Sequence, residues 1–283
     1  MLTGAPQANA LIPIFGISRG AGRRALLARS LRLCQMLRTL LIVFIVFVFL
    51  FLIGPFSILY ALLRRSSDVL YAAGRLGSRL GLKLAGIRLV TQGLQNVEPG
   101  KNYLFLANHQ SYCDPPAVVA SIPVNARLIL KKELRKLPLL GLIMEMGGFV
   151  FIDRKDRAQS IEGMKQAVQQ LQKGHSFMIY PEGTRTRTGR LGPFKKGPFI
   201  IAIESGTPII PVSVRGSYEI MPPHRFEIRP GTITVTFHPA IQTAGLTTGD
   251  REALTERVRG AIAADLGELD LSPHETLSAE RTS

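Results

Sequence analysis

The chain has 283 residues, of which 46% are hydrophobic, and this length suits one folded domain with a small membrane module. Its 35 basic and 20 acidic residues give a net charge of +15 at pH 7, a balance typical of proteins that bind nucleic acid or an anionic membrane. Only two cysteines occur, Cys34 and Cys113, which excludes a disulfide framework and a cysteine-based zinc cluster.

The N-terminal part of the chain predicts a lead-in followed by membrane-associated helices. Residues 1–22 are rich in Ala, Gly and Pro, and we expect them to be disordered. From Arg23 to Arg38, leucines are interspersed with arginines, which is typical of a basic helix at a membrane interface. Ser66 to Ala85 repeats this pattern, so we expect it to lie on the bilayer. Residues 23–85 are therefore predicted to form a membrane-anchoring helical module.

The segment from Leu40 to Leu63 contains 24 residues without a charge. As a continuous helix it would reach about 36 Å, enough to span a hydrocarbon core of about 30 Å. Arginines flank the segment on both sides, however, and both flanks favour the cytoplasmic side of a membrane. We therefore favour a re-entrant hairpin with its turn at Gly54–Pro55 over a single span. This segment also favours an anionic membrane over nucleic acid as the partner of the basic chain.

From Ile87 onward, short apolar segments alternate with helical patterns. Strands are predicted at 87–91, 103–107, 126–130, 148–152, 176–180, 208–214 and 232–237. Helices are predicted at 115–121, 138–146, 157–173, 197–205 and 250–266. This alternation predicts an α/β fold in which a largely parallel sheet is flanked by helices. We expect this domain to cover residues 86–270 and a disordered tail to cover residues 271–283.

The strand predicted at 103–107 ends two positions before His109, and a carboxylate, Asp114, follows the histidine five positions later. A histidine can take a proton from a hydroxyl, and a carboxylate on its other ring nitrogen would hold the tautomer that this requires. The spacing therefore suits a base and the group that orients it. Asp114 could alternatively cap a helix that has Pro115 at its first position.

Three further segments carry polar groups at strand ends or an unusual residue within a strand. Gly147 to Arg154 ends in an acid and a guanidinium, and Tyr180 to Arg187 contains several cationic groups after an apolar strand. Pro208 to Val214 is an apolar strand interrupted by Pro211, which we expect at a sheet edge or a bulge. The planar guanidinium forks in these segments match phosphate oxygens better than lysine does.

In this order, the four segments resemble the motifs of the glycerolipid acyltransferase family, and more narrowly its bacterial 1-acyl-sn-glycerol-3-phosphate acyltransferases. The resemblance covers roughly residues 86–239. It implies that His109 is the general base and that Asp114 orients it. It assigns acceptor binding to Arg154, Glu182, Gly183, Thr184 and Arg185, with Arg185 on the phosphate, and it places Pro211 near the donor or the site wall. Glu182 could contact an acceptor hydroxyl, fix Arg185, or simply shape the loop. Tyr180 stands where the family commonly has phenylalanine.

The resemblance implies transfer of a fatty acyl group from a thioester donor, acyl-CoA or acyl carrier protein, to lysophosphatidic acid. It implies no further cofactor and no metal, and it places the protein on the inner (cytoplasmic) membrane with its catalytic domain facing the cytoplasm. A thiol nucleophile at Cys113 is rejected, because the base would serve the substrate. Alternatives are an acyltransferase for another lysolipid, such as lyso-ornithine lipid, and a non-catalytic basic protein that binds membranes. The arginine loop alone does not fix the acceptor headgroup.

Overall fold

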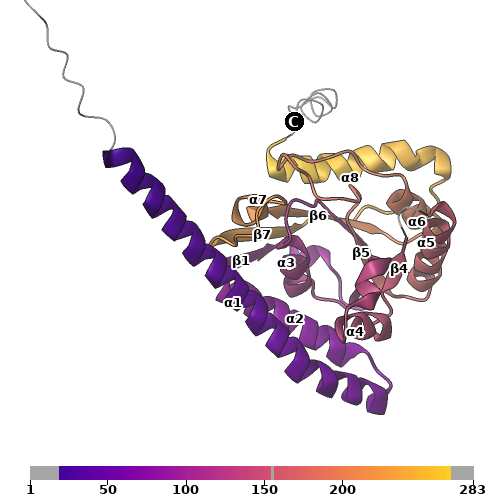
Figure 1. Ribbon diagram of the computed structural model, residues 1–283. Coiled ribbons are helices and arrows are strands. Elements are labelled where there is room, and N and C mark those ends of the chain that lie inside the picture. Colours follow the sequence, from indigo (N-terminus) through magenta and orange to yellow (C-terminus); the bar gives the residue numbers. More distant parts are fainter. Residues whose placement is uncertain (1–18, 154–155, 269–283) are drawn as a thin grey trace, which may run out of the picture.

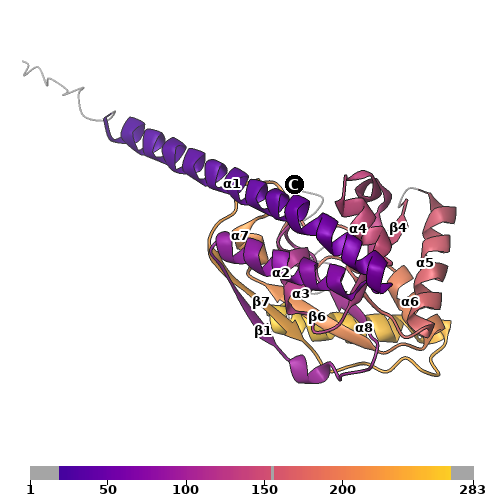
Figure 2. The same ribbon diagram turned by 90° about the horizontal axis from the view of Figure 1, so that it is seen from below.

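The computed structural model describes residues 19–153 and 156–268 and shows a helical hairpin packed against an α/β domain (Figure 1). The first helix, α1 (Arg19–Arg64), is followed by α2 (Asp68–Leu84), which runs back along it. Residues 19–22 of the expected lead-in already belong to α1, and residues 1–18 and the expected tail, 271–283, lie outside the described residues. The N-terminal half of α1 projects beyond the domain (Figure 2).

Helix α1 runs unbroken through Gly54 and Pro55, so the predicted hairpin turn at that position is wrong. A proline inside a helix removes one backbone hydrogen bond and introduces a steric clash, but packing can hold the helix together. Gly54 permits such packing, because a Cβ at this position would lie 2.8 Å from Leu139 Cδ2 of the domain. Ser57 Oγ also donates to Ile53 O (2.9 Å) in the same part of the helix. The chain reverses later, at Arg65, which has a φ of 49°.

The hairpin is joined to the domain by polar contacts at several points. The N–H of Ile228 donates to Thr39 Oγ1 at the start of the apolar segment of α1 (3.1 Å). From α2, Arg75 Nη1 donates to Asn125 Oδ1 (2.8 Å). These contacts place α1 along the side of the domain, and the residues between Gln35 and Arg64 make it long and apolar enough to cross a membrane by length and composition alone.

A seven-stranded sheet forms the centre of the domain, in the order β1-β7-β6-β2-β5-β3-β4. All neighbouring strands are parallel except β6 and β7, which confirms the predicted fold class. All seven predicted strands are present, as β1 (Ile87–Gln92), β2 (Leu104–Ala107), β3 (Ala126–Lys131), β4 (Val150–Ile152), β5 (Ser176–Ile179), β6 (Ile209–Arg215) and β7 (Gly231–Phe237).

The five predicted helices of the domain are also present, with ends shifted by at most a few residues. They are α3 (Asp114–Ser121), α4 (Leu140–Met146), α5 (Arg157–Gln172), α6 (Gly197–Ser205) and α8 (Arg251–Leu266). Short elements that the sequence did not predict are α7 (Ser217–Ile220) and the 3-10 helices Leu94–Asn96, Lys132–Lys136 and Thr248–Asp250.

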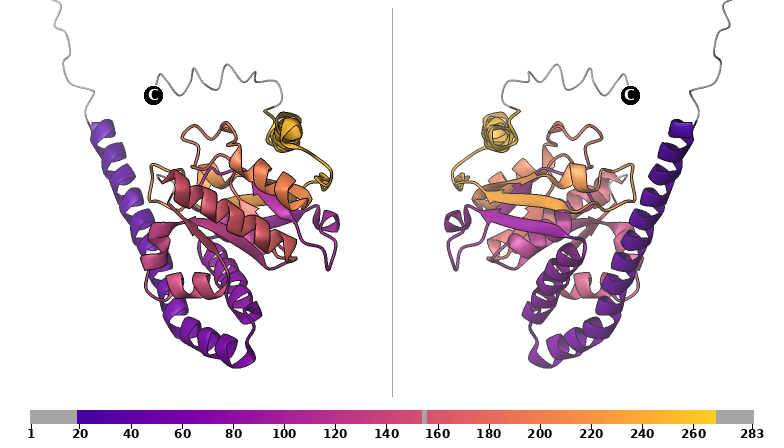
Figure 3. Two further views of the ribbon diagram at one scale, coloured as in Figure 1. Left: turned by 90° about the vertical axis from the view of Figure 1, so that its right-hand side faces the viewer. Right: turned by 90° about the vertical axis from the view of Figure 1, so that its left-hand side faces the viewer.

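Helices cover both faces of the sheet, so the core has two layers (Figure 3). Phe105 and Ala107 of β2 pack with side chains of α2 and α3 on one face. Leu104 and Leu106 pack with α5, α6 and α8 on the other face. All four side chains are fully buried, as expected for a strand of a parallel sheet that is covered on both faces.

Pro211 lies in β6, which has a neighbour on each side, so the predicted place at a sheet edge is wrong. The alternative, a place at a bulge, agrees with the pairing: Val212 pairs with Phe237 but Ile209 pairs with Ile241, so the chain after β7 has one extra residue opposite this part of β6. The carbonyl of Pro211 accepts a hydrogen bond from the N–H of His238 (2.9 Å), just past the last residue of β7. Because the N–H and C=O of one strand residue point to the same side, the N–H that proline lacks would face the end of β7. The pairing of Pro211 with Leu106 on the β2 side is therefore unaffected.

Candidate active site

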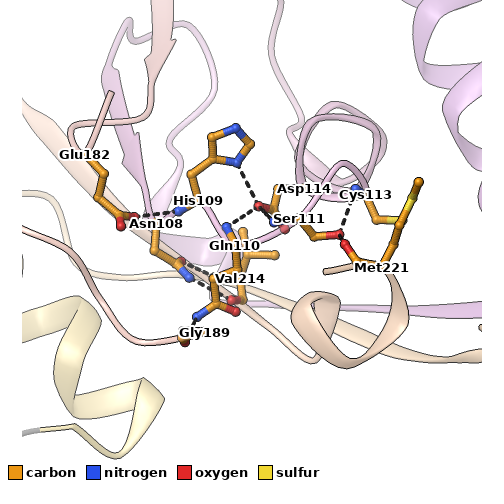
Figure 4. Close-up of polar contacts among 10 residues, drawn as sticks. All are labelled: Asn108, His109, Gln110, Ser111, Cys113, Asp114, Glu182, Gly189, Val214 and Met221. Carbon is orange, nitrogen blue, oxygen red and sulfur yellow. Dashed lines mark hydrogen bonds and ion pairs between the residues drawn. The ribbon is translucent and has the colours of Figure 1, made fainter. Parts of the chain in front are cut away.

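The candidate site lies at the edge of the sheet where β2, β5 and β6 end, because these three parallel strands share their direction. The loop after β2 carries His109, whose Nδ1 lies 2.8 Å from Asp114 Oδ2 (Figure 4). The same carboxylate oxygen accepts the N–H groups of Gln110 (2.6 Å) and Ser111 (2.7 Å). With Nδ1 protonated toward Asp114, Nε2 of His109 is left as the proton acceptor.

Asp114 is fully buried and is the first residue of α3, but its side chain does not cap that helix. It binds the preceding turn instead, so the alternative N-cap role is wrong. A buried carboxylate needs such donors, because removing the charge from water is otherwise costly. The geometry that the sequence predicted for a base and its orienting group is therefore present.

Hydrogen bonds to more distant strands and loops fix the turn that carries His109 (Figure 4). Asn108, directly before it, donates to Val214 O (2.9 Å) and accepts the N–H of the same residue (2.7 Å). Ser111 Oγ donates to Met221 O (2.7 Å), and Gln110 Nε2 donates to Gly189 O (2.9 Å). The position of His109 thus depends on β6 and on the loops that follow β5 and β6.

Glu182, in the loop after β5, is buried and binds backbone amides with both of its oxygens. Its Oε1 accepts the N–H of His109 (2.7 Å), and its Oε2 accepts the N–H of Gly192 (2.9 Å). The N–H of Thr186 in turn donates to His109 O (2.9 Å). Burial raises the pKa of the Glu182 carboxyl to about 7, and the two backbone hydrogen bonds oppose this shift. Of the three roles considered for Glu182, this placement favours shaping the loop.

The other residues assigned to acceptor binding lie on the same loop or outside the described residues. Gly183 has a φ of 73°, a conformation that favours glycine, and Thr184 is exposed. Arg185 is half-buried, and its Cζ lies 3.4 Å from the centre of the Tyr112 ring. Arg154 falls in the gap between the described residues, so its assigned role stays a prediction.

Tyr180 and Cys113 complete the surroundings of His109. The ring of Tyr180 stacks on that of His109 with centroids 4.0 Å apart, and its buried hydroxyl has no hydrogen-bond partner among the described residues. Burial, with a smaller effect of the Asp114 charge, raises the pKa of Tyr180 well above its usual value. Burial also raises the pKa of Cys113 to about 11, so this cysteine stays a thiol at neutral pH and is a poor nucleophile.

An apolar cavity of about 910 Å³ extends from His109 to the helical hairpin. Its walls come from α1, α2, α3, β3 and α4, and Tyr112, Cys113 and Tyr180 line it near the base. Pro211, which the resemblance placed near the donor or the site wall, is buried in the sheet and is not one of the described residues that line this cavity. The arrangement combines a proton acceptor, a long apolar space and a guanidinium on a neighbouring loop.

Sequence analysis missed the contacts made by Asn108, Gln110, Tyr112 and the ring of Tyr180. An asparagine and a glutamine on either side of a candidate base are a usable signal, because such side chains commonly bind backbone groups. The partner of Tyr112 lies 73 positions away in the chain, and only the fold brings the two together.

The sequence is similar to known acyltransferases. The profile of the family described as "Acyltransferase" matches residues 88–215. A "1-acyl-sn-glycerol-3-phosphate acyltransferase" of Limnanthes douglasii is 35% identical over 171 residues, which make up 60% of this chain and 60% of the plant protein. The human "1-acyl-sn-glycerol-3-phosphate acyltransferase beta" is 31% identical over 191 residues, which make up 67% of this chain and 69% of the human protein. This chain thus spans about 60% of the length of the plant relative.

A solved structure is similar over nearly its whole length. It is the crystal structure of "the 1-acyl-sn-glycerophosphate (LPA) acyltransferase, PlsC, from Thermotoga maritima". The TM-score is 0.76 and the sequence identity is 26%, and the match covers 85% of this chain and 98% of the other. The likeness therefore extends beyond the region matched by the family profile.

A pH-dependent stability is expected from Glu182. Its folded-state pKa of about 7 lies above the value of about 4.3 for an unfolded glutamate, so the folded chain binds an extra proton between these pH values. Raising the pH through this window should therefore lower the free energy of unfolding of wild type, relative to that of Glu182→Gln, by on the order of 3 kcal/mol. We would measure chemical unfolding of both proteins in detergent from pH 4.5 to pH 8.5.

The control is Glu204→Gln, which removes a charge from an exposed position on α6. The free energy of unfolding of wild type minus that of Glu182→Gln should fall up to about pH 7 and stay level above about pH 8. A difference that does not change with pH would show that burial does not shift the pKa of Glu182.

Proposed function

The chain belongs to the acyltransferase family that includes the 1-acyl-sn-glycerol-3-phosphate acyltransferases, and we propose that it acylates lysophosphatidic acid. A fatty acyl group moves from a thioester donor to the free hydroxyl of the acceptor and gives phosphatidic acid. The observation that carries this proposal is the His109–Asp114 pair at one end of a long apolar cavity, beside the loop of Arg185. The proposal is also supported by the plant and human relatives, which are named 1-acyl-sn-glycerol-3-phosphate acyltransferases.

In the proposed reaction, Nε2 of His109 accepts the proton of the acceptor hydroxyl while the hydroxyl oxygen attacks the thioester carbonyl. A new C–O bond forms, and the tetrahedral intermediate then releases the thiolate as the C–S bond breaks. The thiolate takes the proton from His109 and leaves as a thiol, so the base is restored. Asp114 stabilises the imidazolium that exists between these two steps.

The acceptor phosphate is proposed to bind Arg185. Its guanidinium can form two parallel hydrogen bonds with a phosphate, and its Nη1 is buried without a partner among the described residues. Gly183 and Thr184 precede Arg185 in the loop that a hydrogen bond of Glu182 connects to His109. Arg154 is proposed as a second cation that binds the acceptor. Exposed Arg187, Arg190, Lys195 and Lys196 add positive charge nearby, which attracts anionic lipids and the phosphates of a donor.

The apolar cavity is proposed to receive an acyl chain. Its volume of about 910 Å³ and its lining by aliphatic and aromatic side chains suit a hydrocarbon chain whose carbonyl lies near His109. The donor is a thioester of either coenzyme A or acyl carrier protein. A panel of lyso-acceptors, including lyso-ornithine lipid, assayed with both donors tests the activity directly. Transfer to lyso-ornithine lipid but not to lysophosphatidic acid would replace the proposed acceptor.

We propose that the protein lies on the cytoplasmic face of the inner membrane, with the hairpin in one leaflet. The domain contacts α1 at Thr39 and again at Gly54, a separation of about 22 Å along a helix. An α1 that crossed the bilayer would draw this polar domain into the hydrocarbon. An α1 that lies in the membrane plane instead immerses only its exposed apolar side chains, among them Phe44, Phe51, Phe56 and Leu63.

Replacing the base tests the mechanism. His109→Ala should lower transfer by about 100-fold to 10,000-fold, because general-base catalysis typically contributes this much. Asp114→Asn should also be severely impaired, since the amide would not hold the imidazolium in the same way. Radiolabelled acyl transfer to lysophosphatidic acid measures both effects, and circular dichroism and membrane sedimentation check folding and localisation. Cys113→Ala is the control and should keep most activity. Turnover of His109→Ala at the wild-type rate would refute the mechanism.

Changing the proposed phosphate ligand tests the acceptor site. Arg185→Lys should weaken acceptor affinity, because a point charge cannot reproduce the two parallel bonds of a guanidinium. We would compare the KM for lysophosphatidic acid with the KM for the uncharged monoacylglycerol. An equal loss with both acceptors would show that Arg185 is structural and does not recognise the phosphate.

Cysteine labelling tests the proposed topology. With α1 in the plane of one leaflet, both termini should be cytoplasmic, as the arginines on both sides of the apolar segment also favour. Cys34 and Cys113 would be replaced, and one new thiol added as Ser18→Cys or Ser272→Cys. Both thiols should resist a membrane-impermeant reagent until the cells are lysed. Labelling of Ser18→Cys from outside intact cells would mean that α1 spans the membrane.

A further inference from the structure

Arg185, the proposed phosphate ligand, is held by an aromatic ring. Its Cζ lies 3.4 Å from the centre of the Tyr112 ring, well within the distance of about 6 Å at which a cation and an aromatic face attract each other. Tyr112 is 51% exposed and lines the cavity together with His109. The contact therefore lies at the site and not in the hydrophobic core.

The two side chains come from loops whose backbones are locked to each other. Tyr112 belongs to the turn between His109 and Asp114, which the Asp114 carboxylate organises. Arg185 directly precedes Thr186, whose N–H donates to the carbonyl of His109 (2.9 Å). The ring and the guanidinium are thus brought together by the same contacts that position the base.

An aromatic partner has a chemical consequence that a carboxylate partner would not have. A carboxylate would occupy the N–H fork of Arg185 and compensate its charge, whereas a ring binds the flat face of the guanidinium and leaves its edge donors available. Among the described residues, Arg185 forms no ion pair, and its Nη1 is buried without a partner. A phosphate could therefore meet a charged fork that is already oriented.

We propose that Tyr112 is a positioning residue that holds the guanidinium of Arg185 flat, so that its N–H edge is set for the phosphate of the acceptor. This inference rests on the proposed function, because it assigns a phosphate-bearing acceptor to the site. It makes Tyr112 a determinant of the preference for phosphorylated over uncharged lysolipids. Preorganisation of this kind raises affinity because less side-chain freedom is lost on binding.

The test measures the binding of lysophosphatidic acid and of the matching monoacylglycerol to the purified full chain in detergent. In wild type, lysophosphatidic acid should bind more tightly. Tyr112→Leu should reduce the ratio of the two dissociation constants by about 3-fold to 10-fold, the range expected for a cation–π contact at a half-exposed site. In kinetic assays the loss should fall on the KM for lysophosphatidic acid more than on kcat.

Several variants separate the face of the ring from other properties of Tyr112. Tyr112→Phe keeps the ring and should keep the ratio, whereas Tyr112→Gln is a second non-aromatic variant and should behave like Tyr112→Leu. Tyr60→Leu changes a tyrosine of α1 that is exposed to a similar extent, 52%, and should leave the ratio as in wild type. In an Arg185→Gln background, Tyr112→Leu should have no further effect on the ratio, because the two residues act as a pair.

The outcomes distinguish this inference from the proposed function. A wild-type protein that prefers lysophosphatidic acid in binding but transfers no acyl group to it would refute the proposed activity and leave the role of Tyr112 standing. Active wild type with an unchanged ratio in both Tyr112→Leu and Tyr112→Gln would overturn the inference alone. A fall in the ratio for Tyr112→Phe equal to that for Tyr112→Leu would also overturn it, since the ring would then be irrelevant.

Discussion

The site depends on one buried carboxylate, that of Asp114, which gathers three donors on a single oxygen. Two of the donors are the backbone N–H groups of Gln110 and Ser111, and the third is the ring of His109. A buried charge needs such compensation, and here the compensating groups are the loop itself. The interaction that orients the His109 ring therefore also stabilises the turn that carries it.

A second buried acid, Glu182, joins this turn to the loop after β5 through the backbone N–H of His109. Its two oxygens accept the N–H groups of His109 and Gly192, and its pKa is raised to about 7 because burial outweighs these bonds. Asp114 thus orients the His109 ring, whereas Glu182 connects the loop after β2 to the loop after β5. Arg185 lies on the loop after β5, and the ring of Tyr112, on the loop after β2, contacts the flat face of its guanidinium.

The fold and the contact between His109 and Asp114 could be predicted from the sequence because both depend on local patterns. Apolar runs separated by polar turns mark all seven strands, and the interval between His109 and Asp114 is short enough for one turn. Features that depend on distant partners could not be predicted. Gly54–Pro55 has the signature of a break, but packing of α4 against α1 keeps the helix whole. Pro211 is tolerated in a central strand because the regular pairing of β6 with β7 is interrupted next to it. The contact of Glu182 with the N–H of His109 likewise could not be predicted, because it depends on the pairing of β2 with β5 in the sheet.

The helical hairpin lines the cavity of the candidate site and is also the proposed membrane contact. The cavity that includes His109 is lined by Val46, Leu50 and Ile53 of α1 and also by Leu128 and Leu130 of β3. The boundary expected at residues 85–86 therefore separates two halves of one cavity and not two independent functions. If α1 lies in a leaflet, the same helix that meets the hydrocarbon on its outer side forms the wall of an acyl-chain space on its inner side. A lipid substrate could then reach the base from the membrane without its chains crossing water, whose contact with apolar surface is unfavourable. Attachment to the membrane and access of substrate to His109 would follow from the packing of one helix.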